Sequence, residues 1–247
     1  MNINYQNLRK EFEKKGFFVC KNFFSEDFNS NLINEIYSSN DNDKYYDGNN
    51  ILRRIERLYD KGANLKKLNE KILNLLKNIF NEEFLIFKDK FNAKPPGGEG
   101  FFAHYDGVFH FTNQNDEIKR GWYEYGDFFI NTLVALDECN KENGSLELAE
   151  SHQGGFDQLL ENTKKNGTPA LLKEVESKIS FSLINLNIGD MVVFSSTCPH
   201  RSKKNNSKKN RRILYYTYSL SKNGSKYKKY FEDKAASKNT SKALSQK

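Results

Sequence analysis

Residues 87–106 read FKDKFNAKPPGGEGFFAHYD, with a strong turn signal in the middle and a His-x-Asp triplet at the end. The run of strand formers stops at Pro95-Pro96-Gly97-Gly98, and residues 99–103 follow this turn. That segment leads into His104-Tyr105-Asp106. Side chains two residues apart on an extended segment point to the same side. One imidazole and one carboxylate can therefore reach the same metal ion.

The sequence on both sides of this stretch predicts helices first and strands later. Leu65, Leu68, Ile72 and Leu75 recur at helical spacing and predict an amphipathic helix over residues 64–80. Earlier in the chain, the apolar run at 16–20 predicts a buried strand, and Ser25 is a candidate helix N-cap. Further strands are expected at 84–92, 128–137, 145–148, 179–186, 191–195 and 211–220. The pattern indicates an α+β fold with a mainly β core, a sandwich or barrel, and N-terminal flanking helices.

Composition favours a single folded domain over residues 1–235. The chain has 247 residues, 37% of them hydrophobic and 14% aromatic, which is enough for a real core. Residues 236–247 are expected to form a basic, flexible tail. No apolar run is long enough to cross a membrane, so no membrane partner is expected. The N-terminus has no signal-peptide core and the three cysteines are scattered, so a cytoplasmic protein is expected.

The basic charge is concentrated near the C-terminus. Residues 201–247 carry 15 Lys or Arg and two acidic residues. This excess fits an anionic partner or a solvated tail, and both interpretations stay open. No nucleic-acid binding motif accompanies the charge, so nucleic acid is not an expected partner.

A second imidazole completes a metal site. His200 stands at the end of a predicted strand, and two His with one carboxylate form the facial triad of non-haem Fe(II) oxygenases. By itself this pattern is weak, because His-x-Asp triplets are common by chance. Arg211 and Arg212 begin the next predicted strand, and either guanidinium could pair with the far carboxylate of 2-oxoglutarate. Strand alternation does not choose between them.

Several segments in order resemble the phytanoyl-CoA dioxygenase family of Fe(II)/2-oxoglutarate enzymes. The resemblance covers about residues 10–235. It includes the short run Gly16-Phe17-Phe18-Val19 near the N-terminus, and its other matching segments are residues 87–98 leading into the triplet, 135–138 with 143–147, 151–155, and 189–212. The resemblance implies a double-stranded β-helix, that is, a cupin-like jelly roll.

The same resemblance implies the ligands and the cofactors. It places iron on His104, Asp106 and His200, and it assigns the 2-oxoglutarate carboxylate to Arg211 with help from Ser202. These residues would serve an oxidoreductase that decarboxylates 2-oxoglutarate to succinate and CO2 while it hydroxylates a C–H bond. Asp106 itself argues for hydroxylation, because halogenating relatives carry a small residue there.

Other residues are weaker candidates. Lys94 and Thr132 are candidate cofactor contacts, with a surface lysine as the alternative for Lys94. Candidate substrate contacts are Asn92, His110, Trp122 and Tyr105. Tyr105 departs from the Gln common in the family, and the alternative for Trp122 is lid packing. His152 and Cys198 are expected to be structural.

The resemblance also limits the substrate. A bacterial branch of the family with similar segments includes dioxygenases of aminoalkylphosphonates. We therefore expect a small, charged metabolite, either an aminoalkylphosphonate or an amino acid-like zwitterion, together with dioxygen. The alternatives are a hydroxylase of an acyl-CoA or carrier-bound substrate and a cupin-type binding protein without oxygenase activity. The oligomeric state stays open.

Overall fold

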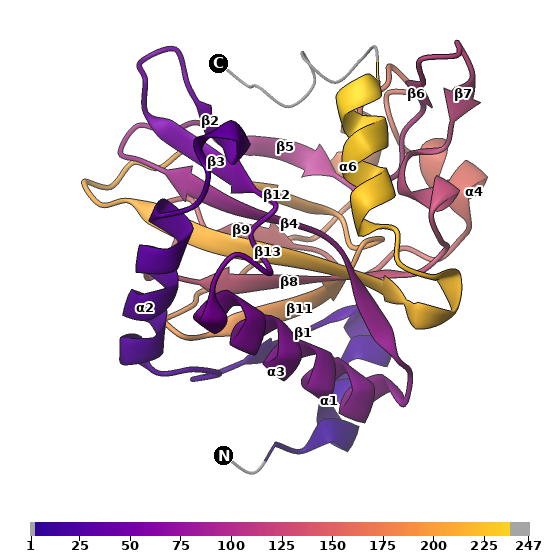
Figure 1. The fold of residues 1–247 in the computed structure, drawn as a ribbon. Helices are drawn as coiled ribbons and strands as arrows, with labels where there is room; N and C mark the ends of the chain where they lie inside the picture. Colours follow the sequence, from indigo (N-terminus) through magenta and orange to yellow (C-terminus); the bar gives the residue numbers. More distant parts are fainter. Residues whose placement is uncertain (1–2, 238–247) are drawn as a thin grey trace.

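The computed structural model describes residues 3–237 and places two antiparallel sheets face to face (Figure 1). The larger sheet has seven strands in the order β1-β11-β8-β13-β4-β3-β2, and the smaller has four in the order β10-β9-β12-β5. A separate two-stranded ribbon is formed by β6 and β7. The strands are β1 (Phe17–Cys20), β2 (Lys44–Tyr46), β3 (Leu52–Glu56), β4 (Phe84–Lys94), β5 (Phe101–His104), β6 (Phe111–Thr112), β7 (Ile118–Lys119), β8 (Phe129–Ala135), β9 (Leu146–Leu148), β10 (Ser182–Leu183), β11 (Met191–Ser195), β12 (His200–Ser202) and β13 (Arg211–Leu220).

The three N-terminal helices cover the outer face of the seven-stranded sheet. The helices are α1 (Tyr5–Lys15), α2 (Glu26–Tyr37), α3 (Ala63–Phe80), α4 (Phe156–Leu160), α5 (Lys173–Glu176) and α6 (Tyr227–Ala236). Apolar side chains of α1, α2 and α3 pack on Phe91, Val134 and Leu214 of the sheet. The inner face of the same sheet packs on β9 through Leu133, Leu146 and Leu148 among others. The predicted α+β jelly roll with N-terminal flanking helices is confirmed.

Local signals in the sequence placed several elements correctly. The predicted strands at 191–195 and 211–220 coincide with β11 and β13. Ser25 caps α2, because its side chain accepts a hydrogen bond from the Phe28 N–H. The strand expected at 179–186 shrinks to β10, and the sequence did not predict β3, β5 or β12.

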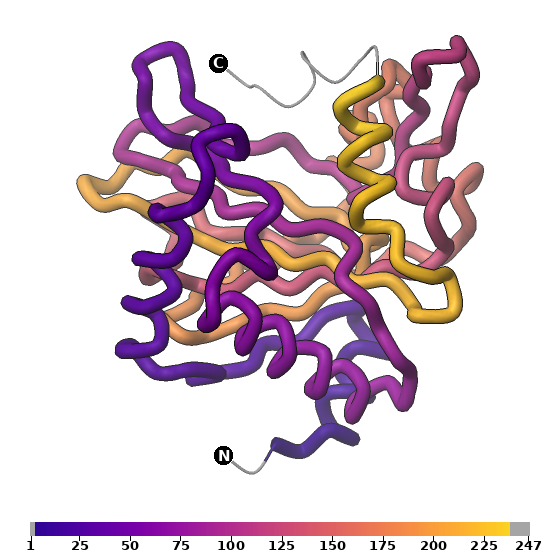
Figure 2. Tube along the Cα trace, viewed as in Figure 1, coloured from indigo at the N-terminus to yellow at the C-terminus, as the bar shows by residue number. Residues whose placement is uncertain are grey.

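The last described helix stands apart from the N-terminal ones. Figure 2 shows α6, in yellow, at the end of the molecule away from α1. Lys234 of α6 forms an ion pair with Glu56, and Asp233 accepts a hydrogen bond from the Tyr125 hydroxyl. Of the predicted tail, Ala236 ends α6 and residues 238–247 lie outside the described residues. The single-domain boundary at residue 235 stays a prediction.

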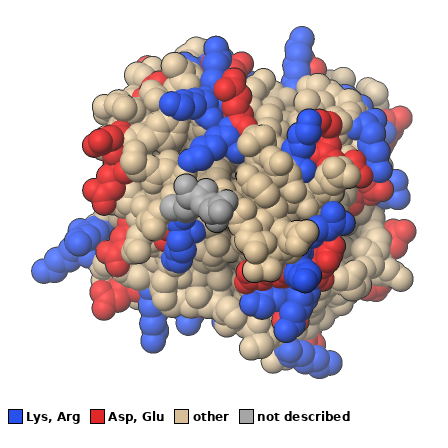
Figure 3. All heavy atoms as spheres, turned by 90° about the horizontal axis from the view of Figure 1, so that it is seen from below, with Lys and Arg blue, Asp and Glu red and all other residues tan. Residues whose placement is uncertain are grey.

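The face seen from below carries charges of both signs. In Figure 3, Lys and Arg side chains lie beside Asp and Glu over this face. Within residues 3–237, no helix is long and apolar enough to cross a membrane.

Candidate active site

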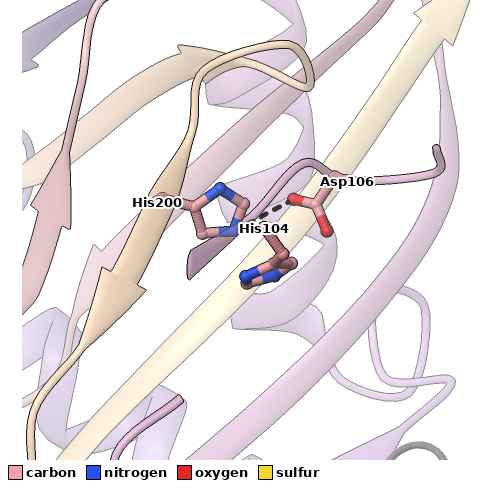
Figure 4. A group of neighbouring side chains, drawn as sticks. All are labelled: His104, Asp106 and His200. Atoms are coloured by element: carbon pink, nitrogen blue, oxygen red, sulfur yellow. Dashed lines mark ion pairs between the residues drawn. The ribbon is translucent and has the colours of Figure 1, made fainter. Parts of the chain in front are cut away.

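The three predicted metal ligands meet at one point in the structure. His104 ends β5 and lies directly opposite His200, the first residue of β12. Asp106 follows two residues later, where its backbone N–H donates to the Ser196 carbonyl. One ligand atom from each of the three lies within 4.8 Å of the others. Figure 4 shows the two rings and the carboxylate converging. The segments that bring them together lie about a hundred residues apart in the chain.

Backbone carbonyls fix how both imidazoles face the site. His104 Nδ1 lies 2.9 Å from the Phe102 carbonyl oxygen, and His200 Nδ1 lies 3.0 Å from that of Cys198. A carbonyl only accepts, so each Nδ1 carries the proton and donates it. Each Nε2 is then left with a lone pair for a metal. Burial, and next the His200 charge, lower the pKa of His104 to about 3, which keeps this imidazole neutral.

Asp106 is held as a carboxylate by a short hydrogen-bond chain. Thr217 Oγ1 donates to Asn131 Oδ1 over 2.7 Å, and Asn131 Nδ2 donates to Asp106 Oδ2 over 2.9 Å. Burial alone would raise the pKa of Asp106, but His200 and Lys88 lower it, with a net lowering. The carboxylate Oδ2 lies 3.5 Å from His200 Nε2. Asp106 is therefore charged and oriented before any metal binds.

Arg211 and Arg212, which strand alternation left open, have different surroundings. Arg211 is buried opposite Lys94, and its Nε has no hydrogen-bond partner within the described residues. Arg212 points to the other face and forms two hydrogen bonds to Asp137 through Nε and Nη2. A buried guanidinium with an unpaired N–H suits a carboxylate ligand. Of these two arginines, only Arg211 has such an N–H.

The donor set fits iron and 2-oxoglutarate. Two imidazole nitrogens and one carboxylate are the ligands of non-haem Fe(II) oxygenases, which leave positions open for a bidentate co-substrate and dioxygen. Arg211, buried and unpaired at Nε, fits the distant carboxylate of 2-oxoglutarate. The residues that the structure brings together are therefore compatible with both expected cofactors.

Lys94 and Ser202 lie beside Arg211 but already have protein partners. Lys94 Nζ donates to the Gly144 carbonyl (3.2 Å), the Lys203 carbonyl (2.6 Å) and Ser202 Oγ (2.9 Å). The three hydrogen bonds of this nitrogen are thus all made with the protein. Ser202 accepts from Lys94, so its own hydroxyl proton is left for another acceptor. Lys94 is placed to position Ser202 rather than to hold a ligand directly.

Thr132 lies on the wrong face of β8 for the predicted cofactor contact. Alternation along the strand turns it to the side of Tyr216, whose carbonyl accepts its hydroxyl hydrogen bond at 3.2 Å. That side is packed against the helices. Its neighbour Asn131 faces inward and contacts Asp106 instead. The predicted strand contains an inward-facing residue beside the metal ligands, but this residue is Asn131 and not Thr132.

A cavity of about 140 Å³ opens beside the metal ligands. Its wall is rich in aromatic and basic side chains and includes the predicted Trp122. The lining residues are Lys88, Lys90, Phe101, Phe102, His104, Asp106, Gly107, Phe109, Phe111, Gly121, Trp122, Tyr125, Gly167, Pro169, Tyr230, Lys234 and Ser237. Lys88, Lys90 and the residues from α6 were not among the predicted site residues.

The other predicted substrate contacts lie outside this lining. Tyr105 points away from the metal ligands, where its hydroxyl contacts His152 Nδ1 and accepts from Asn162. This contact agrees with the structural role expected for His152. The His110 ring packs on Phe156. Asn92 shares the inward face of β4 with Lys90 but does not reach the cavity wall.

Cys198 is fully buried. It packs in the core between the two sheets and its Sγ contacts the Gly16 carbonyl. This placement agrees with the structural role expected for it.

The fold and the metal ligands together define a class, the Fe(II)- and 2-oxoglutarate-dependent oxygenases. The family model described as phytanoyl-CoA dioxygenase (PhyH) matches residues 12–213. The chain belongs to this family. It is accordingly an Fe(II)/2-oxoglutarate-dependent dioxygenase, and the predicted enzyme class and cofactors are confirmed.

Three similar proteins illustrate the relationship. The 2-aminoethylphosphonate dioxygenase of the uncultured bacterium HF130_AEPn_1 is 29% identical over 93% of this chain and 87% of its own length. The methylphosphonate hydroxylase of Gimesia maris is 31% identical over 64% of this chain and 54% of its own. The crystal structure of EctD from S. alaskensis in its apoform superposes with a TM-score of 0.69 at 18% identity. That match covers 90% of this chain and 80% of EctD, and it bears on the fold.

Proposed function

We propose that this dioxygenase hydroxylates a small phosphonate. The observation that carries the proposal is the charge of the cavity beside the metal ligands. Its charged lining residues are Lys88, Lys90, Lys234 and Asp106, and Asp106 is needed by the metal. A wall with this excess of positive charge favours an anionic substrate. The names of two relatives, a 2-aminoethylphosphonate dioxygenase and a methylphosphonate hydroxylase, support the same substrate class.

The chain's own residues divide the work of the reaction. His104, Asp106 and His200 would hold the iron, and Arg211 with the Ser202 hydroxyl would hold the far carboxylate of 2-oxoglutarate. When bound, iron and 2-oxoglutarate supply oxidation of a C–H bond by dioxygen, with release of succinate and CO2. The protein contributes orientation and a small aromatic cavity that limits access of water.

The aromatic wall leaves room for a substrate with or without an amine. Among the described lining residues, Asp106 is the sole acid, so an ammonium group would have to rest on ring faces such as those of Phe101 or Phe109. An alkylphosphonate needs no such contact. Both kinds of compound therefore belong in the first test. The expectations of a cytoplasmic location and of no nucleic-acid partner stay predictions.

The test measures succinate with and without substrate. The protein is supplied with Fe(II), 2-oxoglutarate and air, and methylphosphonate or 2-aminoethylphosphonate is added. We expect one of them to stimulate succinate formation and to yield an equal amount of hydroxylated product by ³¹P NMR. The Asp106→Ala variant should show no stimulation. Formation of an Fe(II)–2-oxoglutarate complex without stimulation by either compound would contradict the phosphonate assignment but leave the enzyme class intact.

A further inference from the structure

Two lysines of β4 line the cavity with no hydrogen-bonding or ion-pairing partner among residues 3–237. Lys88 and Lys90 are two residues apart on the strand and therefore point to the same side. Both line the cavity together with His104 and Asp106. Within residues 3–237, neither ammonium forms a hydrogen bond or an ion pair. An enclosed cation without a partner is unfavourable, and a bound anion removes that cost.

Aromatic rings hold both ammonium groups in place without neutralising them. Lys88 Nζ lies 4.2 Å from the centre of the Trp122 ring, and Lys90 Nζ lies 4.8 Å from that of Tyr215. Such contacts orient a cation while its N–H groups stay available. Burial, and next the Lys90 charge, lower the pKa of Lys88 to about 7. An anion between the two lysines would counter both effects.

These lysines lie at the level of the metal, away from the 2-oxoglutarate end of the site. Thr217, which holds Asp106 through Asn131, lies opposite Lys88 in the sheet. Arg211 lies opposite Lys94, four residues beyond Lys90. At the rise of a β-strand this is about 13 Å. A co-substrate that reaches from the metal to Arg211 extends away from Lys88 and Lys90, so the two lysines are left for another anion.

We propose that Lys88 and Lys90 together bind the phosphonate group of the substrate and thereby set its carbon chain beside the metal. The inference rests on the proposed function and names the residues that would select its substrate class. Lys234 also lines the cavity, but its ammonium is paired with both carboxylate oxygens of Glu56. Lys88 and Lys90 are therefore the cations whose charge a ligand would balance.

The test separates substrate binding from co-substrate binding. Lys88→Met, Lys90→Met and the double variant are compared with Lys66→Met, which removes an exposed charge from α3 on the far side of the sheet. Methylphosphonate binding is measured by calorimetry on the anaerobic protein with Fe(II) and 2-oxoglutarate. The visible charge-transfer band of the iron chelate reports 2-oxoglutarate binding in the same samples. Neutral dimethyl methylphosphonate is the ligand control.

We expect each single variant to weaken methylphosphonate binding by about 30-fold. The absorption band and the 2-oxoglutarate midpoint should stay as in the wild type, and Lys66→Met should change neither. Dimethyl methylphosphonate should bind weakly and equally to all variants. Circular dichroism melting confirms that each variant is folded.

Each contrary outcome has its own meaning. Unchanged methylphosphonate binding in the double variant overturns the inference. An equal loss of 2-oxoglutarate binding assigns the lysines to the co-substrate and also overturns it. A wild-type protein with the iron band but no methylphosphonate binding rejects both the inference and the phosphonate substrate. A wild type that binds methylphosphonate without forming the band, with the variants weakened, keeps the anion site and rejects the proposed reaction.

Discussion

The C-terminal end and the middle of the inward face of β4 carry the same residue type in opposite circumstances. At the end, Lys94 Nζ is hydrogen-bonded to the Gly144 and Lys203 carbonyls and to Ser202 Oγ. In the middle of the strand, Lys88 and Lys90 have no hydrogen-bonding partner within the described residues and face the cavity. Lys94 is part of a structural hydrogen-bond network, whereas Lys88 and Lys90 are the two lysines that we propose to bind the substrate. Alternation along a strand predicts the face on which a side chain lies, but only its neighbours decide its role.

Substitution of a metal ligand should have the largest effect on iron binding and turnover. Asp106→Ala and His104→Ala should abolish iron binding and lower turnover by more than about a thousandfold, because each removes one of three ligands. Iron content after anaerobic loading and the succinate assay measure this. His152→Ala, which alters a histidine outside the metal site, should retain iron. Full activity of either ligand variant would show that the metal site is elsewhere.

Next to Lys94, the adjacent residues Arg211 and Arg212 give a matched comparison. Arg211→Ala should raise the 2-oxoglutarate concentration needed for half-maximal activity by about 100-fold, the loss expected for a charge-assisted pair. Arg212→Ala removes the bonds to Asp137 on the other face and should leave that concentration within about twofold. Titration of the visible band with 2-oxoglutarate measures both. Equal effects in the two variants would reject the assignment of Arg211.

At the level of Lys88, the support of Asp106 can be tested on two neighbouring residues. Asn131→Ala should weaken Fe(II) binding by about 30-fold, because it frees the carboxylate that Asn131 orients. Thr132→Val alters the adjacent, outward-facing residue and should leave Fe(II) affinity unchanged. A competitive chelator titration measures both affinities. Loss of iron from Thr132→Val alone would show that the face assignment is reversed.

The lysine comparison itself predicts opposite effects on stability. Lys94→Met leaves two carbonyls without their donor and should lower the free energy of unfolding by about 3 kcal/mol. Lys88→Met removes an unpaired cation and should be neutral or slightly stabilising. Urea unfolding of both variants, without ligands, measures the difference. Comparable destabilisation by both would mean that Lys88 also has a structural partner.

The smallest effect is a pH dependence at the cavity end. The pKa of Lys88 is about 7, and the charged groups acting on it are Lys90, Asp106, Lys234 and Glu56. As pH rises through 7 the folded protein loses this charge, while methylphosphonate only becomes more anionic. The affinity for the dianionic form of methylphosphonate should therefore fall about fivefold between pH 7 and pH 8. Calorimetry at both pH values measures this, and Lys88→Met should remove the dependence. A rise with pH would contradict a role for Lys88.

Much of the metal site could be predicted, because its residue types are rare in this chain. The sequence has only four histidines, and the two with a matching pattern are the ones that meet at Asp106. The choice of Arg211 over Arg212 needed the family resemblance, because the polarity of the strand is mixed on both faces. In the structure, Asp137 distinguishes them by engaging Arg212.

The substrate side could be predicted only in part. Trp122 lies in the cavity, but Thr132 was chosen where Asn131 faces inward, because β8 is buried on both faces and shows no polar alternation. Lys88 and Lys90 could have been predicted to face inward, because they lie on the same side of β4 as the candidates Asn92 and Lys94. Tyr230 and Lys234 had none, because their approach depends on how α6 packs back on the sheet.

The position of α6 has a consequence for how this enzyme diverges from its relatives. The family model matches residues 12–213 and so includes every metal ligand and Arg211, but it ends before α6 begins. Tyr230 and Lys234, which α6 contributes to the cavity, therefore lie outside that matched region. Substitutions in this one helix can reshape the wall that faces the substrate while the oxidising centre is inherited intact. An exchange of α6 would thus change this part of the cavity wall and leave all three metal ligands in place.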